Sequence, residues 1–160
     1  MSKKYWLKPL GLPELRIEKD WFEKATEQIH FAERPLSVNI GDILFLYAVK
    51  HQKIVGVVEV NSNFSEFTVD EIAEPEYAWR ERFRYYLYAD NLLKIYTKNW
   101  VDYNLDPNLL DGKFANNDTN LVTPTNYSIN AIQHGKGHIQ LTQAFSQHLF
   151  DLMKARCTTI

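Results

Sequence analysis

The 160-residue chain has a single cysteine, Cys157, which excludes an internal disulfide framework. It has no apolar run near ~18 residues and no charged-then-apolar leader, which predicts an intracellular, cytoplasmic protein with no membrane segment. Lys and Arg number 18 against 20 Asp and Glu, a formal net charge of −2. The chain as a whole therefore lacks the strong basic footprint that most nucleic-acid-binding proteins show.

The sequence also lacks the short motifs by which many enzymes are identified. It contains no G-x-S-x-G, no Walker loop and no G-x-G-x-x-G. His134 and His138 stand at the spacing of helical metal ligands, but Gly135 and Gly137 disfavour a rigid helix there. Cys157 has no base near it in sequence. We therefore expect no catalytic residue, no metal site and no cofactor.

Aromatic residues, by contrast, are plentiful. Nine Phe, nine Tyr and four Trp make up 14% of the chain, and most of them should pack in a core because aromatic side chains bury large areas. The length suits one domain spanning residues 1–160, since domains commonly run to roughly 100–200 residues.

Local patterns predict a strand over residues 3–10, stopped by Pro9, and then a helix over residues 19–34. Asp20 and Glu23 have the spacing of an acidic capping box at the start of that helix. Its apolar residues then recur at helical spacing, at Phe22, Ala25, Ile29 and Ala32.

The stretch GDILFLYAVKHQKIVGVVEV, residues 41–60, predicts a β-hairpin. A Gly-Asp turn precedes residues 43–49, which are apolar on both faces and suit a central strand. After the polar turn KHQK, residues 54–60 form a second strand rich in β-branched residues. Gly56 interrupts this strand, at a point where another backbone or a ring can approach closely.

Further along, residues 79–96 alternate as a long strand would, with Trp79 on one face and Arg80 and Arg82 on the other. Residues 99–130 are rich in Asn and predict an irregular excursion. A last helix begins after Thr142, with an apolar stripe at Phe145, Leu149 and Leu152. This order of elements favours an α+β protein with a small curved sheet or barrel.

Several rings stand at the ends of predicted elements, where they could gather at one rim of a barrel. They are Tyr5, Trp6, Trp21, Tyr47, Tyr77 and Trp79. Rings at a rim could stack on a planar base. For any single ring the alternative, that it plugs the end of the barrel, is favoured because most buried rings are packing residues.

The hairpin, extended by two residues to NIGDILFLYAVKHQKIVGVVEV, resembles the central hairpin of the EVE domain family, a branch of the PUA-like superfamily related to YTH and ASCH domains. The matching residues are Gly41, Asp42, Tyr47, Ile54, Val55, Gly56, Glu59 and Val60. Three further blocks resemble the family in the same order: YWLK at residues 5–8, WRERFRYYL at residues 79–87 and GHIQLTQAFSQHL at residues 137–149.

This resemblance implies a PUA-like small curved β-barrel with flanking helices, whose rim pocket accepts a flipped, often modified, base. The positions that match the family pocket are Trp6 with Lys8, Trp21, Tyr47 and Trp79. The resemblance also implies that the missing side chain of Gly56 lies opposite Tyr47. The chain departs from the family after Lys8, with Pro-Leu-Gly, and after Tyr47, with Ala-Val. The polar groups that read a base edge are therefore expected from elsewhere in the chain.

The resemblance leads us to predict a non-catalytic module that holds a modified base of DNA or RNA, with Lys8, Arg80 and Arg82 meeting phosphate oxygens. Two alternatives remain open. One is a small ASCH-like amide hydrolase acting on acylated nucleosides through Lys8 or Glu59, although the G-x-K-x-x-E-x-R signature is absent. The other is a peptide-binding scaffold module with a large exposed apolar patch.

Overall fold

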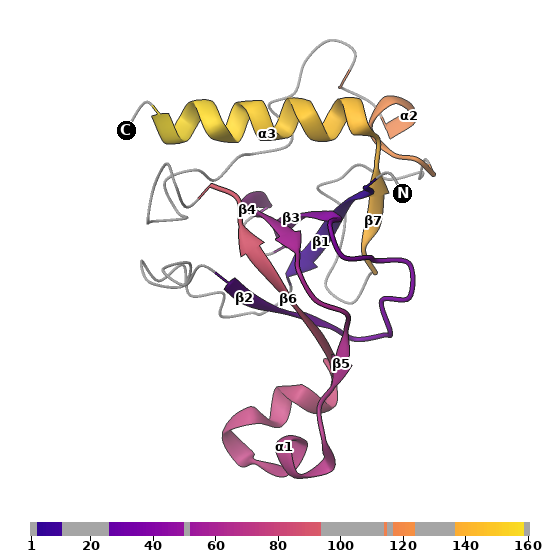
Figure 1. The fold of residues 1–160 in the computed structure, drawn as a ribbon, viewed down its shortest axis with the longest axis vertical. Coiled ribbons are helices and arrows are strands. Elements are labelled where there is room, and N and C mark those ends of the chain that lie inside the picture. Colours follow the sequence, from indigo (N-terminus) through magenta and orange to yellow (C-terminus); the bar gives the residue numbers. More distant parts are fainter. Residues whose placement is uncertain are drawn as a thin grey trace.

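A sheet of seven strands, crossed at one end by a long helix, forms the centre of the computed structural model (Figure 1). The structure describes residues 3–10, 26–49, 52–93, 114, 117–123 and 137–158. The strands are β1 (Tyr5–Leu10), β2 (Thr26–Phe31), β3 (Ile43–Ala48), β4 (Lys53–Val60), β5 (Ser65–Glu66), β6 (Tyr85–Asn91) and β7 (Ile139–Leu141). The helices are α1 (Val69–Ala73), the 3-10 helix η1 (Pro75–Glu81), α2 (Asn117–Asn120) and α3 (Gln143–Thr158).

The strands run in the order β2-β6-β4-β3-β1-β7, and β5 pairs with β6 beside this path. Only β1 and β3 pair in parallel among the described strands, and the other pairs are antiparallel. Helix α3 lies across one end of the sheet, while α1 belongs to a lobe that projects beyond β5 at the opposite end (Figure 1). The expected α+β class is confirmed.

The expectation of a barrel is not met, because the sheet is not closed. Closure would require β2 and β7 to pair with each other, and the described residues form no such pair. The outer edge of β7 is instead taken by the segment after α2. Leu121 bridges Leu141, and the Val122 amide donates to the Gln140 carbonyl at 3.0 Å.

The central hairpin is confirmed as β3 and β4. Every residue of β3 is buried, as expected for a central strand covered on both faces. The register shifts between Leu46 and Tyr47, so that Leu46 pairs with Gly56 and Tyr47 pairs with Ile54. The expectation that Gly56 lies opposite Tyr47 is therefore wrong by one step, because an irregularity in the ladder displaces the pairing.

The predicted helix over residues 19–34 is wrong for its second half, which forms strand β2. Ile29 and Phe31 are buried, whereas Ala32, which the helical stripe required to be buried, is exposed. The strand pairs with β6 along its whole length, from Thr26 to Phe31. These ladder hydrogen bonds and the alternating burial outweigh a local helical pattern that had the right spacing. Residues 19–25 lie outside the described residues.

The long strand predicted from Trp79 onward is also wrong at its beginning. Residues 75–81 form η1, with Pro75 at the first helical position, and β6 starts only at Tyr85. Trp79, Arg80 and Arg82 therefore lie on a helical turn and its end rather than on opposite faces of a strand. From Tyr85 onward the expected alternation holds, since Leu87 and Ala89 are buried.

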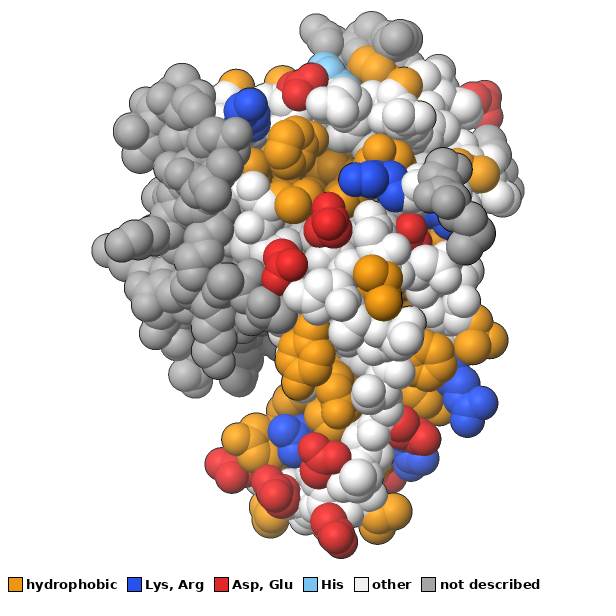
Figure 2. Space-filling view, in the orientation of Figure 1, with side chains coloured by type: hydrophobic (Ala, Val, Ile, Leu, Met, Phe, Trp, Pro, Cys, Tyr) orange, Lys and Arg blue, Asp and Glu red, His pale blue; other side chains and the backbone are white. Residues whose placement is uncertain are grey.

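Helices α1 and η1 make up the projecting lobe, whose surface mixes acidic, basic and apolar side chains (Figure 2). Thr68 caps α1 through a capping box with Glu71. The lobe's exposed charged residues are Asp70, Glu74, Glu76, Glu81, Arg82 and Arg84. Acids thus outnumber bases on its exposed surface, which does not form a continuous basic face.

The last predicted helix is confirmed as α3. The Thr142 hydroxyl accepts a hydrogen bond from the Phe145 amide at 3.3 Å, and Phe145, Leu149 and Met153 are buried against the sheet as one stripe. Leu152, which the sequence placed in that stripe, is only half-buried. None of the helices in the described ranges is long and apolar enough to cross a membrane.

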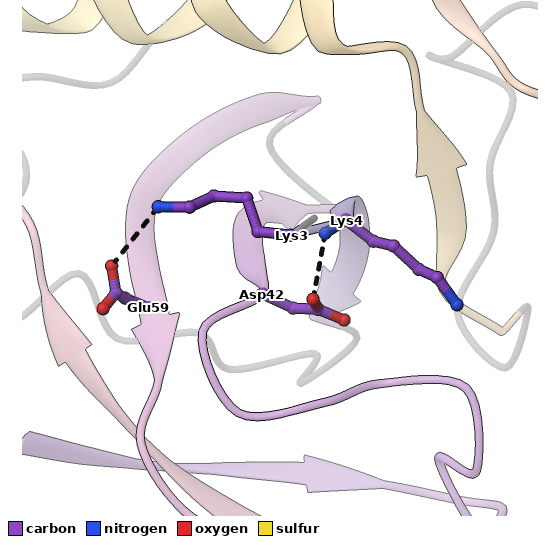
Figure 3. Close-up of polar contacts among 4 residues, drawn as sticks. All are labelled: Lys3, Lys4, Asp42 and Glu59. Atoms are coloured by element: carbon purple, nitrogen blue, oxygen red, sulfur yellow. Dashed lines mark hydrogen bonds and ion pairs between the residues drawn. The ribbon is translucent and has the colours of Figure 1, made fainter. Parts of the chain in front are cut away.

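Asp42 joins the start of β1 to the turn before β3. Its side chain is buried, 2% exposed, and accepts hydrogen bonds from the amides of Lys4 and Asn39, both at 2.9 Å, and from the Trp6 indole at 3.1 Å. Figure 3 shows the contact with Lys4 next to the ion pair between Lys3 and Glu59. Gly41 precedes it with φ of +93°, a conformation that glycine adopts without strain.

Replacing Asp42 by Ala is expected to lower the free energy of unfolding by about 3 kcal/mol, because a buried indole and two amides lose a charged acceptor. Urea denaturation followed by fluorescence measures this change. Asp70→Ala, at an exposed position of α1, is the matched control and should change stability by less than about 0.5 kcal/mol. Equal stabilities for the two variants would contradict the role assigned to Asp42.

Candidate functional site

Trp6 and Lys8 lie on the same face of β1, because alternate residues of a strand point to the same side. Both are nearly buried, with 6% and 7% of their surfaces exposed. The indole nitrogen of Trp6 is bound to Asp42, which fixes its ring. Of the residues predicted for a pocket, Trp6 and Lys8 are thus brought together, but inside the protein rather than at an open rim.

Lys8 is a buried cation whose surroundings are largely apolar. Its ammonium donates to the Pro9 carbonyl at 3.1 Å and lies 4.7 Å from the centre of the Phe31 ring. Burial lowers the pKa of Lys8 from 10.5 to about 8, because the charged form loses its hydration. Within the described residues no carboxylate pairs with Lys8.

His138 completes a group that we call the Lys8 cluster: Trp6, Lys8, Phe31 and His138. The imidazole lies edge-on to Trp6 at 4.9 Å and to Phe31 at 5.6 Å between ring centres. Its Nε2 is 3.5 Å from the Ser37 hydroxyl. His138 directly precedes β7, and the pairing of Leu7 with Ile139 places it next to Lys8.

A second group, the Trp79 cluster, consists of His30, Phe67, Tyr77, Trp79 and Arg80. The guanidinium carbon of Arg80 is 3.9 Å from the centre of the Tyr77 ring and 4.6 Å from that of Phe67. Arg80 also donates to the Glu71 carbonyl at 3.2 Å. Trp79 lies edge-on to His30 at 4.6 Å. Arg80 is therefore held among rings and is not free to reach outward.

Lys8 connects the two clusters electrostatically. Burial and the charge of Lys8 lower the pKa of His138 from 6.5 to about 4. Burial, Lys8 and then Arg80 lower the pKa of His30 to about 4 as well. Both imidazoles are therefore neutral at physiological pH. His30 Nε2 is 2.7 Å from the Gln28 side-chain oxygen, an acceptor, which places the ring proton on Nε2.

The remaining predicted site residues are not in these clusters. Tyr47 is fully buried and belongs to the hydrophobic core. Arg82 is exposed, with its guanidinium carbon 5.6 Å from the Phe83 ring centre. Trp21 lies outside the described residues. Glu59, which the hydrolase alternative names beside Lys8 as a possible catalytic residue, pairs with Lys3 at 4.0 Å.

Sequence reasoning missed His30, Phe31, Phe67 and His138 as members of the site. His30 and Phe31 fall within the helix predicted over residues 19–34, whereas the structure places them on strand β2. The sequence suggested His138 as half of a metal pair with His134, which lies outside the described residues, and as part of the block at residues 137–149, but not as a pocket residue. In the part of the chain that the structure describes, no group of three potential metal ligands occurs.

The arrangement supplies one strong hydrogen-bond donor, Lys8, and two neutral imidazoles, each with one donor and one acceptor, among aromatic rings. Such groups can bind a flat, polar ligand, whereas none of them forms the nucleophile-and-base pair typical of covalent catalysis. The chain matches no protein-family model and no curated protein. The resemblance to EVE domains therefore stays a prediction.

Two substitutions should separate the charges that act on the histidines. Lys8→Met is expected to raise the pKa of both His30 and His138, while Arg80→Gln should raise that of His30 alone. Each rise will be partial because burial is the larger cause. Imidazole nitrogen shifts measured by NMR over a pH titration test this, and an unchanged His30 in both variants would contradict the geometry.

The two histidines should also make stability depend on pH. In the unfolded chain their pKa values return to about 6.5, so between pH 6.5 and 4 the unfolded state binds protons that the folded state does not. The free energy of unfolding should fall as the pH is lowered through this window.

Urea denaturation at several pH values measures that fall. In the double variant His30→Gln with His138→Gln, the free energy of unfolding should fall less steeply with decreasing pH than in the unaltered protein. An equal dependence of the free energy of unfolding on pH in the double variant and the unaltered protein would refute the assignment.

Proposed function

We propose that this protein is a non-catalytic module that binds a modified nucleobase of DNA or RNA on a PUA-like fold. The Lys8 cluster and the Trp79 cluster would bind the base, and the flipped base would enter by displacing some of the ring-to-ring contacts now made by His138. The cost of unstacking a base, a few kcal/mol, must then be offset by these contacts.

The observation that carries this proposal is the position of Lys8. A buried ammonium that has no carboxylate partner among the described residues and lies against the Phe31 ring is costly for a protein to maintain. The oxygens and ring nitrogens of a nucleobase are acceptors that would satisfy it. Rings next to it offer the stacking or edge contacts that planar bases make with proteins.

The burial of Lys8 changes the role that the sequence suggested for it. A side chain 7% exposed suits a group of the ligand that enters the protein, rather than a phosphate that stays on the outside of the nucleic acid. Arg82 is the member of the predicted set that is exposed and available for phosphate. With a net charge of −2, specificity for the base would carry most of the affinity.

Binding should be measured by calorimetric titration of the full chain with oligonucleotides that differ only in one base modification. At least one modified base is expected to bind about tenfold more tightly than its unmodified parent. Replacing Trp79 by Leu should weaken this binding by about tenfold, since a base contact with an aromatic ring is worth ~1–3 kcal/mol.

Phe64→Leu is the matched control, because Phe64 contacts Tyr85 and belongs to neither cluster. Its affinity should stay within about twofold of the unaltered protein. Equal millimolar binding of all modified and unmodified oligonucleotides would overturn the proposed function.

A further inference from the structure

Lys8 has more hydrogen-bonding capacity than the described residues of the protein use. An ammonium carries three N–H donors, and in the described structure one of them is taken by the Pro9 carbonyl at 3.1 Å. The contact with Phe31 is to the ring, which offers no lone pair. The rest of the donor capacity of Lys8 is therefore available to a ligand that reaches it.

The positive charge of Lys8 is also not balanced by nearby acids among the described residues. The Asp42 carboxylate is directed to the Trp6 indole and two amides, and Glu59 pairs with Lys3. Among the described residues, the charge of Lys8 acts on the titratable side chains of His30 and His138, both neutral in the folded protein. Arg80, which acts on His30, adds a second cation to the region.

A buried, uncompensated charge is costly, and an opposite charge on the ligand removes that cost. We propose that the base taken by this site carries an anionic carboxylate on its ring, and that Lys8 binds this carboxylate. The inference rests on the proposed base-binding function and names the chemical class of the modification.

A carboxylate attached to a base is the anion that fits these surroundings. It is flat and lies in or near the plane of the base. The ammonium lies against the flat ring of Phe31, and that ring contacts His138, which in turn contacts Trp6. A backbone phosphate is tetrahedral and stays outside the base stack, where the exposed Arg82 is better placed to meet it. A methyl group in the same place would leave the charge of Lys8 uncompensated.

The test uses one DNA sequence carrying cytosine, 5-methylcytosine or 5-carboxycytosine at a single position, titrated against the full chain by calorimetry. The carboxylated base is expected to bind at least tenfold more tightly than the methylated one. An unmodified oligonucleotide with a 5′-phosphate should show no such gain, which separates a base carboxylate from a phosphate as the source of charge.

Lys8→Met should remove the preference for the carboxylated base, while Lys8→Arg, which keeps the charge, should retain a part of it. Lys3→Met is the control for loss of a positive charge elsewhere on the protein and should keep the full preference. NMR spectra of each variant show whether it is folded.

The outcomes separate the two proposals. If no base modification improves binding over cytosine, the base-binding function fails. If the methylated base binds more tightly than cytosine but the carboxylated one does not exceed it, or if folded Lys8→Met keeps the carboxylate preference, the inference about Lys8 fails and base binding stands.

Discussion

The carboxylate of Asp42 fixes the position of β1 relative to the central hairpin, and the candidate site depends on it. Its three hydrogen bonds reach the backbone before β1, the turn before β3 and the indole of Trp6. Because β1 pairs in parallel with β3, no short turn joins these two strands, and a buried charged acceptor supplies part of their connection. The same contact orients Trp6, and with it one wall of the Lys8 cluster.

Lys8 is the other unusual feature of this strand. The protein buries an ammonium against the Phe31 ring and keeps two imidazoles neutral in its field. For stability alone, an apolar side chain of similar size would serve at least as well, since it needs no desolvation. The proposed binding of a ligand acceptor to Lys8 would offset the cost of this buried cation.

How far the sequence leads can be judged from particular segments. The hairpin was predictable because the Gly-Asp turn and the polar turn KHQK bound two short apolar runs, and α3 was predictable because its apolar residues recur at helical spacing. The strand over residues 26–31 could not be predicted, since Ile29 fits a helical stripe as well as an alternating strand. Pairing with β6 decided between the two, and this pairing joins residues about 60 positions apart. Trp79 and Arg80 were misplaced for a similar reason. Residue types alternate from Trp79 onward as in a strand, but residues 75–81 fold as η1.

The sequence by itself determined the α+β class, the central hairpin, the last helix and the placement of Trp6 and Lys8 on the same face of one strand. These follow from local periodicity and turn chemistry, which act between near neighbours. Only the tertiary structure decided that the sheet stays open, that Tyr47 is core, and that His30 and His138 lie within the field of Lys8. Burial and electrostatic contact depend on distances between segments remote in the chain, and no local pattern of residues carries that information.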